Sequence, residues 1–459
     1  MGGLRGSRAW YTPALERPWP SPSPMSITEL RIEGLRTLEK IRLKLDGLTV
    51  LIGDNGTGKS SIIEACELLH RAVNERFLDE FYSVHGGLTS LLRQGAPRLK
   101  LGVTIKPDPG EYPKQSTGDW SEFDLVEYDM LLAPEGGAFT SLEETVHAYP
   151  RKGSQLAKSW SRKKQSARTE AAVPLVHRKG SRATAFISAR ERSEIEIADS
   201  APLPAQIHLY TSDYYFDTAI QIIAAHLRSI RVHIPFEVLP SWAARALDRK
   251  SALRASIPFA PARHLEKLGI NLANSFHSLK NNFGREEWNQ TLEYVRLGLG
   301  SHIEDVTTWA DPGGGNVGLS LKLKNLDQQI PSSQLSDGML SYLAFVALFR
   351  LHDGVPGLMA LDEPDLHLHP KLLMRVLDMF ESMAKRFPVL VSTHSDRLLD
   401  GLSEPARSVV LCELDDRQAT HLLRPNPRFL AKWLERYRGL GDIRGEGHEA
   451  SVFTREDPA

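Results

Sequence analysis

Apolar and polar residues alternate along residues 27–52. Segments such as ITELRIEGL and IRLKLDGLTVLI follow this pattern, and Gly34 and Gly47 interrupt it. Alternation of this kind predicts two or three strands, and the glycines predict tight turns between them. We therefore expect a small antiparallel strand pair that leads into a short apolar strand at residues 48–52.

Helical spacing follows from residue 61, where apolar residues recur at intervals typical of a helix that ends near residue 74. The same spacing returns within residues 207–300 without sustained heptads, so we expect helices with loops and no long coiled-coil arm. Further strands are expected at 99–105, 317–323, 358–361, 389–391 and 408–413, with helices after Gly338 and at 371–385. Together these elements indicate an α/β fold.

Residues 106–205 lie between the strand expected at 99–105 and the helical spacing within 207–300. Their composition is richer in Gly, Pro, Ser and charged residues, and we expect an insertion outside the core. Within it, residues 151–192 carry twelve Lys and Arg against Glu170 and Glu191, with Trp160 inside the strip. Two interpretations stay open. The strip either contacts a nucleic-acid backbone or is a solvated, partly disordered loop.

Bulk composition narrows the class of protein. The chain has 459 residues with 41% hydrophobic residues, and its 56 Lys and Arg against 57 Asp and Glu give no global attraction to nucleic acid or membrane. The two cysteines, Cys66 and Cys412, exclude a disulfide framework and favour a reducing, cytoplasmic location. The chain lacks the apolar run of about eighteen residues that a membrane span needs. Residues 1–24 are rich in Pro and Ser, which indicates a disordered tail and leaves Met25 as an alternative start.

The most informative motif lies between the strand at 48–52 and the following helix. Gly53, Gly58, Lys59 and Ser60 complete the pattern G-x-x-x-x-G-K-[ST]. Such a loop turns its N–H groups toward a polyphosphate at the N-terminus of the helix, with the lysine on the outer phosphates and the serine on Mg²⁺. The residues expected to bind nucleotide are Gly53, Asp54, Asn55, Gly56, Thr57, Gly58, Lys59, Ser60 and Ser61.

Two apolar strands downstream end in residues suited to hydrolysis. Asp362 and Glu363 follow the strand at 358–361, at the strand end where α/β sheets place their chemistry. We expect Asp362 to hold Mg²⁺ through its water shell and Glu363 to polarise the attacking water. His394 follows the strand at 389–391, and it either bonds the γ-phosphate or the water or simply caps the strand end.

Three further positions have open interpretations. Ser336 and Gly338 begin an apolar helix, and such an N-terminus is a second anion-binding device that a head-to-tail dimer could present to a nucleotide. Arg36 either reaches a phosphate from the side or is a solvated turn arginine. Gln94 either senses Mg²⁺ or the water, or is an ordinary polar loop residue. His367 and His369 lack a third nearby ligand, so we expect no metal site there.

The segments GDNGTGKSS, QLSDGML, LMALDEPDLHLHP and VSTHS, in that order, resemble the Walker A, signature, Walker B and switch-histidine motifs of ABC-type ATPases of the RecF/SMC/OLD group. The opening ITELRIEGLRTLEK and the segment SLLRQGAPRLKLGVTI are also similar to that group, where Arg36 corresponds to a phosphate-contacting arginine and Gln94 to the Q-loop glutamine, a metal-site residue. Two segments, GINLANSFHSLK and WLERYRGLGDIRGEG, are similar to a stand-alone bacterial branch without a nuclease domain. The signature departs from the transporter pattern, since LSDG stands in place of LSGGQ.

The resemblance implies a P-loop NTPase with an ABC-type ATPase head, in which a mixed sheet flanked by helices joins an antiparallel β lobe. It also implies ATP and Mg²⁺ as ligands, catalysis by Glu363 and His394, and a homodimer or higher oligomer. In that dimer Ser336 and Gly338 of one protomer close over the nucleotide of the other. The expected regions are a tail (1–24), the first part of the head (25–105), a basic insertion (106–205), a helical lobe (206–325), the second part of the head (326–425) and a C-terminal helix and tail (426–459).

Two functions follow as expectations. The first is an ATP-driven dimerisation switch that controls a separate effector, a nuclease or toxin, in bacterial defence or DNA maintenance. The alternative is a RecF-like repair ATPase that clamps DNA through residues 151–192. A nucleotide-bound scaffold without hydrolysis is a third possibility, and the loss of turnover in Glu363→Gln would exclude it.

Overall fold

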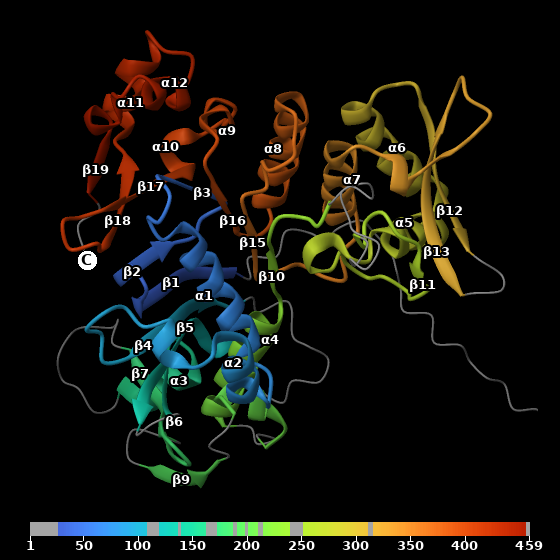
Figure 1. Cartoon of the computed structure of the whole chain (residues 1–459). Coiled ribbons are helices and arrows are strands. Elements are labelled where there is room, and N and C mark those ends of the chain that lie inside the picture. Colours follow the sequence, from blue (N-terminus) through green and yellow to red (C-terminus); the bar gives the residue numbers. More distant parts are fainter. Residues whose placement is uncertain are drawn as a thin grey trace, which may run out of the picture. The chain divides into compact units, whose positions relative to one another are not determined.

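The alternating N-terminal segments form the predicted strand pair. β1 (Ser26–Leu35) and β2 (Leu38–Lys44) run antiparallel, with Leu35 opposite Leu38 at the turn, and the apolar residues of both strands are buried. The pair is part of a computed structural model, shown in Figure 1, that divides into two compact units. The larger unit comprises 22–237, 266–268 and 355–459, and the smaller unit comprises 238–265 and 269–354. The residues that the structure describes are 26–107, 119–135, 139–161, 172–186, 191–197, 201–209, 214–238, 251–310 and 315–455.

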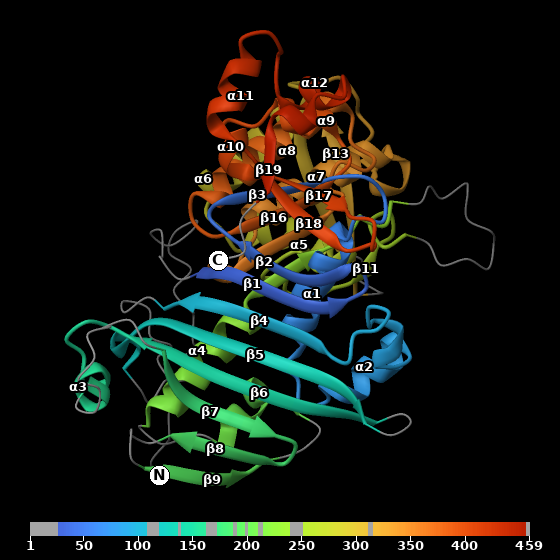
Figure 2. The same ribbon diagram turned by 90° about the vertical axis from the view of Figure 1, so that its left-hand side faces the viewer.

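The larger unit contains an antiparallel sheet of eight strands in the order β2-β1-β4-β5-β6-β7-β8-β9. Figure 2 shows these strands side by side, with α4 (Tyr215–Arg228) across one face, where it packs against β5, β6 and β7. The added strands are β4 (Leu99–Lys106), β5 (Phe123–Glu135), β6 (Phe139–Pro150), β7 (Val173–Lys179), β8 (Arg182–Phe186) and β9 (Arg192–Glu196).

A second sheet of the larger unit has the order β10-β15-β16-β3-β17-β18-β19, and its first five strands run parallel. The carboxyl ends of β3, β15 and β16 therefore meet at one edge, which is where this class of sheet places a ligand. The strands are β10 (Ile230–His233), β15 (Leu358–Asp362), β16 (Val389–Thr393), β3 (Leu48–Ile52), β17 (Val409–Leu414), β18 (Thr420–Pro425) and β19 (Phe453–Arg455).

Helices cover both sheets of the larger unit. α1 packs against β10, β15 and α4, and α8 packs against β16 and β3. None of the helices in the described part of the chain has the length and apolar character that crossing a membrane requires. The other helices are α1 (Lys59–Arg71), α2 (Phe77–His85), α3 (Gln155–Ser161), α8 (Pro370–Ala384), α9 (Asp396–Asp400), α10 (Pro405–Ser408), α11 (Pro427–Leu434) and α12 (Leu440–Gly445).

In the described part of the smaller unit, α5 and α6 pack on a separate sheet and α7 packs against both helices. β13 (Asn316–Leu323) lies between β12 (Ile303–Ala310) and β11 (Ile257–Pro258), and β14 (Ile330–Pro331) also pairs with β13. α5 packs against β12, β13, α6 and α7. These helices are α5 (Leu272–Asn281), α6 (Arg285–Leu299) and α7 (Asp337–Arg350). The described residues of both units also form short 3-10 turns: η1 (Leu88–Ser90), η2 (Trp120–Glu122), η3 (Leu203–Leu209), η4 (Lys267–Gly269), η5 (Ser332–Gln334) and η6 (Glu449–Ser451).

Residues 106–205 differ from the expected insertion outside the core. The described part of this region supplies β5 to β9, and Phe123, Val126, Tyr128 and Met130 of β5 are fully buried. Charged residues lie between these apolar residues along β5 and occupy the other face of the sheet. The average composition of residues 106–205 therefore did not indicate the alternation of apolar and charged positions. Residues 108–118, 136–138, 162–171, 187–190 and 198–200 of this region lie outside the described residues.

Two other regions also differ from expectation. Residues 206–325 do not form a single helical lobe, because α4 belongs to the larger unit whereas α5 and α6 belong to the smaller unit beside a sheet. The C-terminal region holds two helices and β19, which extends the second sheet. The expected tail at 1–24 and the alternative start at Met25 lie outside the described residues.

Candidate functional site

The loop between β3 and α1 depends on three glycines in the left-handed region. Gly53, Gly56 and Gly58 have φ values of 154°, 81° and 91°. A Cβ atom at Gly53 would lie 2.2 Å from the carbonyl oxygen of Cys412, and one at Gly58 would lie 2.8 Å from Oγ1 of Thr37. Side chains are excluded at both positions, and the glycines give the backbone the turn that an anion-binding loop requires.

Lys59 places its ammonium inside this loop. Its Nζ donates hydrogen bonds to the carbonyl oxygens of Gly53 and Asp54, each at 2.8 Å, and its side chain is buried. Burial lowers the pKa of the Lys59 ammonium, because the charged form loses hydration. The neutral carbonyls do not neutralise the ammonium charge, so an anionic ligand would improve its surroundings.

The remaining loop residues separate into an exposed crest and a buried base. Asp54, Asn55 and Gly56 are exposed, whereas Thr57 and Ser61 are buried. Thr57 is held through its side chain and its backbone. Its hydroxyl donates to the Asp54 carbonyl at 2.8 Å, and its own carbonyl accepts from the Thr420 hydroxyl at 3.0 Å. The loop is therefore anchored at its base and open at its crest.

Ser60 and Asp362 meet although 302 residues separate them in the chain. The Ser60 hydroxyl donates to Oδ1 of Asp362 at 3.1 Å, and the buried Ser392 hydroxyl donates to the same oxygen. Hydroxyl and carboxylate oxygens are the ligand types that Mg²⁺ prefers. The donor set thus fits Mg²⁺.

Glu363 is held in an uncommon backbone conformation, with φ of 44°. Its N–H group lies 3.1 Å from both the carbonyl oxygen and the hydroxyl oxygen of Ser392, which fixes this conformation. Its side chain is 30% exposed, and Oε1 lies 3.3 Å from Nε2 of His394. The two residues expected to act in catalysis therefore contact each other at the edge of the sheet.

The position of His394 is set by its neighbour. The Thr393 hydroxyl donates to Oδ1 of Asp365 at 2.7 Å and accepts from the Ser395 N–H at 2.9 Å. These bonds tie the end of β16 to the segment that follows Glu363. Among the described residues no group of three or more His, Cys, Asp or Glu side chains is placed to hold a metal ion, and the expectation for His367 and His369 stays a prediction.

Arg36 and Gln94 are the two remaining positions for which the sequence predicts a role at the nucleotide. Arg36 is in the turn after β1 and pairs with Glu64 of α1 at 3.0 Å. Gln94 is exposed on the segment before β4. Among the described residues, the structure gives neither side chain a contact with Lys59, Ser60 or Asp362, so their expected roles stay predictions.

Ser336 caps the N-terminus of α7 in the smaller unit, as its position in the sequence predicts. Its hydroxyl accepts a hydrogen bond from the N–H of Met339 at 3.3 Å. Asp337 pairs with the buried Arg254, which anchors the first turn of the helix. Ser336 itself is exposed, and Gly338 is half-buried. An exposed N-cap serine leaves this helix end accessible to an anion.

Arg444 also lies near the loop, although no sequence motif marks it. It belongs to α12, and its guanidinium lies 2.7 Å from the carboxylate of Asp396 and 3.5 Å from that of Asp54. No spacing rule predicts this contact, because 390 residues separate Arg444 from Asp54.

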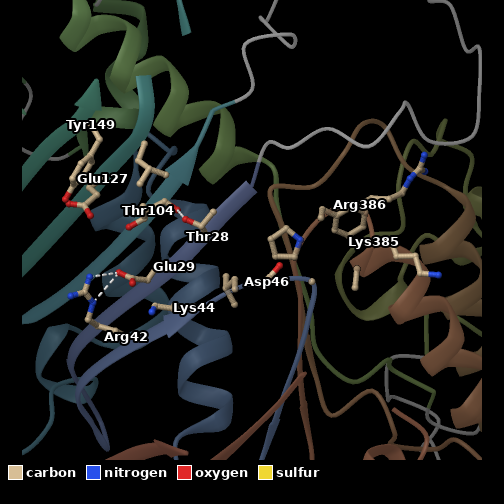
Figure 3. Close-up of a pocket in the computed structure, with 16 residues that line it drawn as sticks. Thr28, Glu29, Arg42, Lys44, Asp46, Thr104, Glu127, Tyr149, Lys385 and Arg386 are labelled. Carbon is tan, nitrogen blue, oxygen red and sulfur yellow. Dashed lines mark hydrogen bonds and ion pairs between the residues drawn. The ribbon is translucent and has the colours of Figure 1, made fainter. Parts of the chain in front are cut away.

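A cavity in the larger unit is lined by residues other than those of this loop, and its volume is about 780 Å³. Figure 3 shows Arg42, Lys44, Lys385 and Arg386 among its lining residues. Two of its acidic residues already have cationic partners. Glu29 pairs with Arg42 at 3.0 Å, and Asp46 pairs with Arg407 at 2.6 Å. These pairs give the cavity a mixed rather than a single-signed charge, and no ligand class follows.

The sequence matches the family described as "AAA domain, putative AbiEii toxin, Type IV TA system" over residues 48–400. This range includes the glycine-rich loop, Asp362, Glu363 and His394.

Curated relatives match a shorter stretch. The DNA replication and repair protein RecF of Bacillus cereus (strain G9842) is 29% identical over 121 residues, which cover 24% of this chain and 32% of the relative. The chain thus spans about a third of the length of the curated relatives that it matches.

Solved structures with a similar arrangement include the SmcHead bound to the C-winged helix domain of ScpA, with a TM-score of 0.49 and 14% identity over 89% of this chain and 99% of that chain. Another is the SMC head domain from Thermotoga maritima, with a TM-score of 0.36 and 12% identity over 87% of this chain and 99% of that chain.

Proposed function

Because the chain belongs to this AAA-domain family of ATPases, we propose that it binds ATP with Mg²⁺ and hydrolyses it. One observation carries the proposal. A single sheet edge brings together the buried ammonium of Lys59, the Ser60–Asp362 pair and the Glu363–His394 pair. These are respectively a phosphate-binding, a metal-binding and a proton-accepting group, the set that phosphoryl transfer to water needs.

Each residue has a distinct role in this proposal. The loop N–H groups and Lys59 bind the polyphosphate, and Lys59 exchanges its carbonyl partners for the outer phosphate oxygens. Ser60 and Asp362 are the residues that would hold Mg²⁺, which supplies neutralisation of phosphate charge. Glu363 orients the attacking water and accepts its proton, while His394 holds the Glu363 carboxylate in position.

We further propose that ATP joins two copies of the chain. The exposed N-terminus of α7 at Ser336 and Gly338 offers N–H groups and a hydroxyl to an anion, and the nucleotide of a second copy is the anion that it would close over. Hydrolysis would then separate the copies and change the state of a separate effector, a nuclease or toxin. The buried free thiols of Cys66 and Cys412 are compatible with the cytoplasm as the site of action.

Phosphate release and light scattering test this proposal together. Wild type should release phosphate, whereas Lys59→Ala should lose nucleotide binding. Glu363→Gln should retain binding, lose turnover and accumulate an ATP-dependent species of twice the mass. Glu39→Gln, at an exposed position of β2, is the matched control and should behave like wild type. Turnover that persists in Glu363→Gln would contradict the assigned role of Glu363.

A second pair of variants tests the role of α7. Ser336→Arg should abolish the ATP-dependent increase in mass, since it blocks the helix N-terminus. Ser333→Arg places the same charge at a nearby exposed position and should leave the increase intact. If both variants or neither abolish the increase, the nucleotide is not closed by Ser336.

The RecF relatives favour DNA clamping as a second candidate. Within the basic strip at 151–192, Arg178 is buried and paired with Glu144, so it is unavailable to DNA, whereas Lys179 and Arg182 are exposed. DNA binding that weakens steeply with salt and is reduced in Lys179→Ala/Arg182→Ala would support this candidate. DNA binding absent with and without ATP would exclude it.

A further inference from the structure

The C-terminal helix α12 reaches the glycine-rich loop through one side chain. Arg444 contacts Asp396 of α9 through Nη1 at 2.7 Å and Asp54 of the loop through Nη2 at 3.5 Å. Its side chain is only 15% exposed, so a cation is held close to the place where nucleotide phosphates are expected.

The backbone of α12 is fitted closely to α9. A Cβ atom at Gly441 would lie 2.0 Å from the carbonyl oxygen of Asp396, and the N–H of Asp442 donates to Oδ1 of Asp400 at 3.0 Å. Because α9 begins two residues after His394, the position of Arg444 is tied to the segment that carries His394.

The guanidinium is incompletely paired. Its Nε atom is buried without a hydrogen-bond partner among the described residues. The contact of Nη2 with Asp54 is at the distance limit of a hydrogen bond, and the Asp54 side chain is 92% exposed. An ion pair with so exposed a partner is weak, because water screens it. A polyphosphate carries more charge and would compete successfully for the guanidinium.

The contacts of Lys59 indicate which phosphates of a nucleotide Arg444 would bind. Its Nζ donates to the carbonyl oxygen of Asp54, the same residue whose carboxylate faces Arg444. In loops of this pattern the lysine reaches the β- and γ-phosphates. Lys59 and Arg444 thus contact the same loop residue, one through its carbonyl oxygen and the other through its carboxylate.

We propose that Arg444 is a phosphate-binding residue that leaves Asp54 for the γ-phosphate of ATP and thereby reports the nucleotide state to α12. The inference rests on the proposed ATP binding and adds a residue from outside the Walker motifs. Through Asp396, the same guanidinium would transmit the presence of the γ-phosphate to α9 and the C-terminal segment.

Equilibrium binding of fluorescent ATP and ADP analogues tests the inference. Arg444→Ala should weaken ATP binding about 10- to 100-fold, the loss expected for one hydrogen bond between charged groups, and ADP binding by a much smaller factor. Arg444→Lys should recover part of the ATP affinity, because it retains the charge without the planar fork. Equal losses for ATP and ADP, or no loss, would overturn the proposal.

Asp396→Asn is the matched structural control. It removes the charge of the other Arg444 partner without removing the guanidinium, so the thermal midpoint should fall to a similar extent in Asp396→Asn and Arg444→Ala. Only Arg444→Ala should lose the preference for ATP over ADP. If Asp396→Asn loses that preference equally, Arg444 acts as a structural tie. If wild type binds neither nucleotide, the proposed function itself fails, whereas normal binding by Arg444→Ala overturns only the inference.

Discussion

Glu144 and Glu363 each contact a basic side chain, on the neighbouring strand for Glu144 and just after it for Glu363, yet their surroundings are opposite. Glu144 on β6 lies opposite Arg178 on β7, and both side chains are fully buried. Arg178, the Tyr128 hydroxyl and the Leu203 N–H all donate to the Glu144 carboxylate.

Glu363 follows β15, and its partner His394 follows the adjacent strand β16. Their side chains are 30% and 37% exposed, and the backbone at Glu363 has positive φ. A saturated buried carboxylate contributes to stability, whereas a half-buried carboxylate in a strained conformation retains capacity for a ligand. The same chemical group thus serves the fold in one sheet and the proposed reaction in the other.

Glu363→Gln should produce the largest change. Loss of the proton acceptor is expected to lower turnover by about 10²- to 10⁴-fold, while the thermal midpoint stays within a degree or two of wild type, on the order expected for a partly exposed substitution. Phosphate release and differential scanning calorimetry measure the two quantities. A large drop in the midpoint would show that Glu363 is structural, like Glu144.

Arg178→Met should show the reverse behaviour. It leaves the Glu144 carboxylate buried without its cationic partner, which is expected to cost about 3–5 kcal/mol of unfolding free energy. Urea unfolding measures this loss, and turnover of the folded fraction should stay near wild type. Glu144→Gln combined with Arg178→Met should recover part of the stability. An unchanged urea midpoint in Arg178→Met would contradict the assigned role of the pair.

The buried imidazole of His226 in α4 should make the free energy of unfolding sensitive to acid. Burial lowers its pKa to about 4, whereas the ordinary value is 6.5. Below pH 6.5 His226 binds a proton in the unfolded state but not in the folded state. The free energy of unfolding therefore decreases as the pH falls toward 4. The expected loss is about 3 kcal/mol. Unfolding free energies measured between pH 7 and pH 4 should decline less steeply in His226→Leu than in wild type.

Ser392→Ala should have the smallest effect. The Ser392 hydroxyl donates to Asp362 and accepts from the Glu363 N–H, so its removal loosens both residues without deleting either. Turnover is expected to fall about tenfold, the equivalent of one hydrogen bond, with less change in stability than in Arg178→Met. A loss as large as that of Glu363→Gln would mean that Ser392 acts directly in the reaction.

The motifs and their immediate supports could be predicted from the sequence. The anion-binding loop is local, since Gly53, Gly56 and Gly58 set its backbone within a few residues. The short apolar strands before Asp362 and before His394 can also be recognised from their local sequence, and strands of this kind place their carboxyl ends at one edge of the sheet. The family match over residues 48–400 and the RecF relatives confirm the resemblance to ABC-type ATPases of the RecF/SMC group.

The resemblance implied an antiparallel β lobe, but its strands within residues 106–205 and the Arg444 contact were decided only by the tertiary structure. The strands within residues 106–205 are stabilised by cross-strand partners and by α4. The composition of the segment itself does not indicate either of these contacts. Likewise, Arg178 looks like one more residue of a basic strip until β6 places Glu144 opposite it. A local sequence pattern fixes backbone shape over a few residues, but burial and charge pairing depend on residues that only folding brings together.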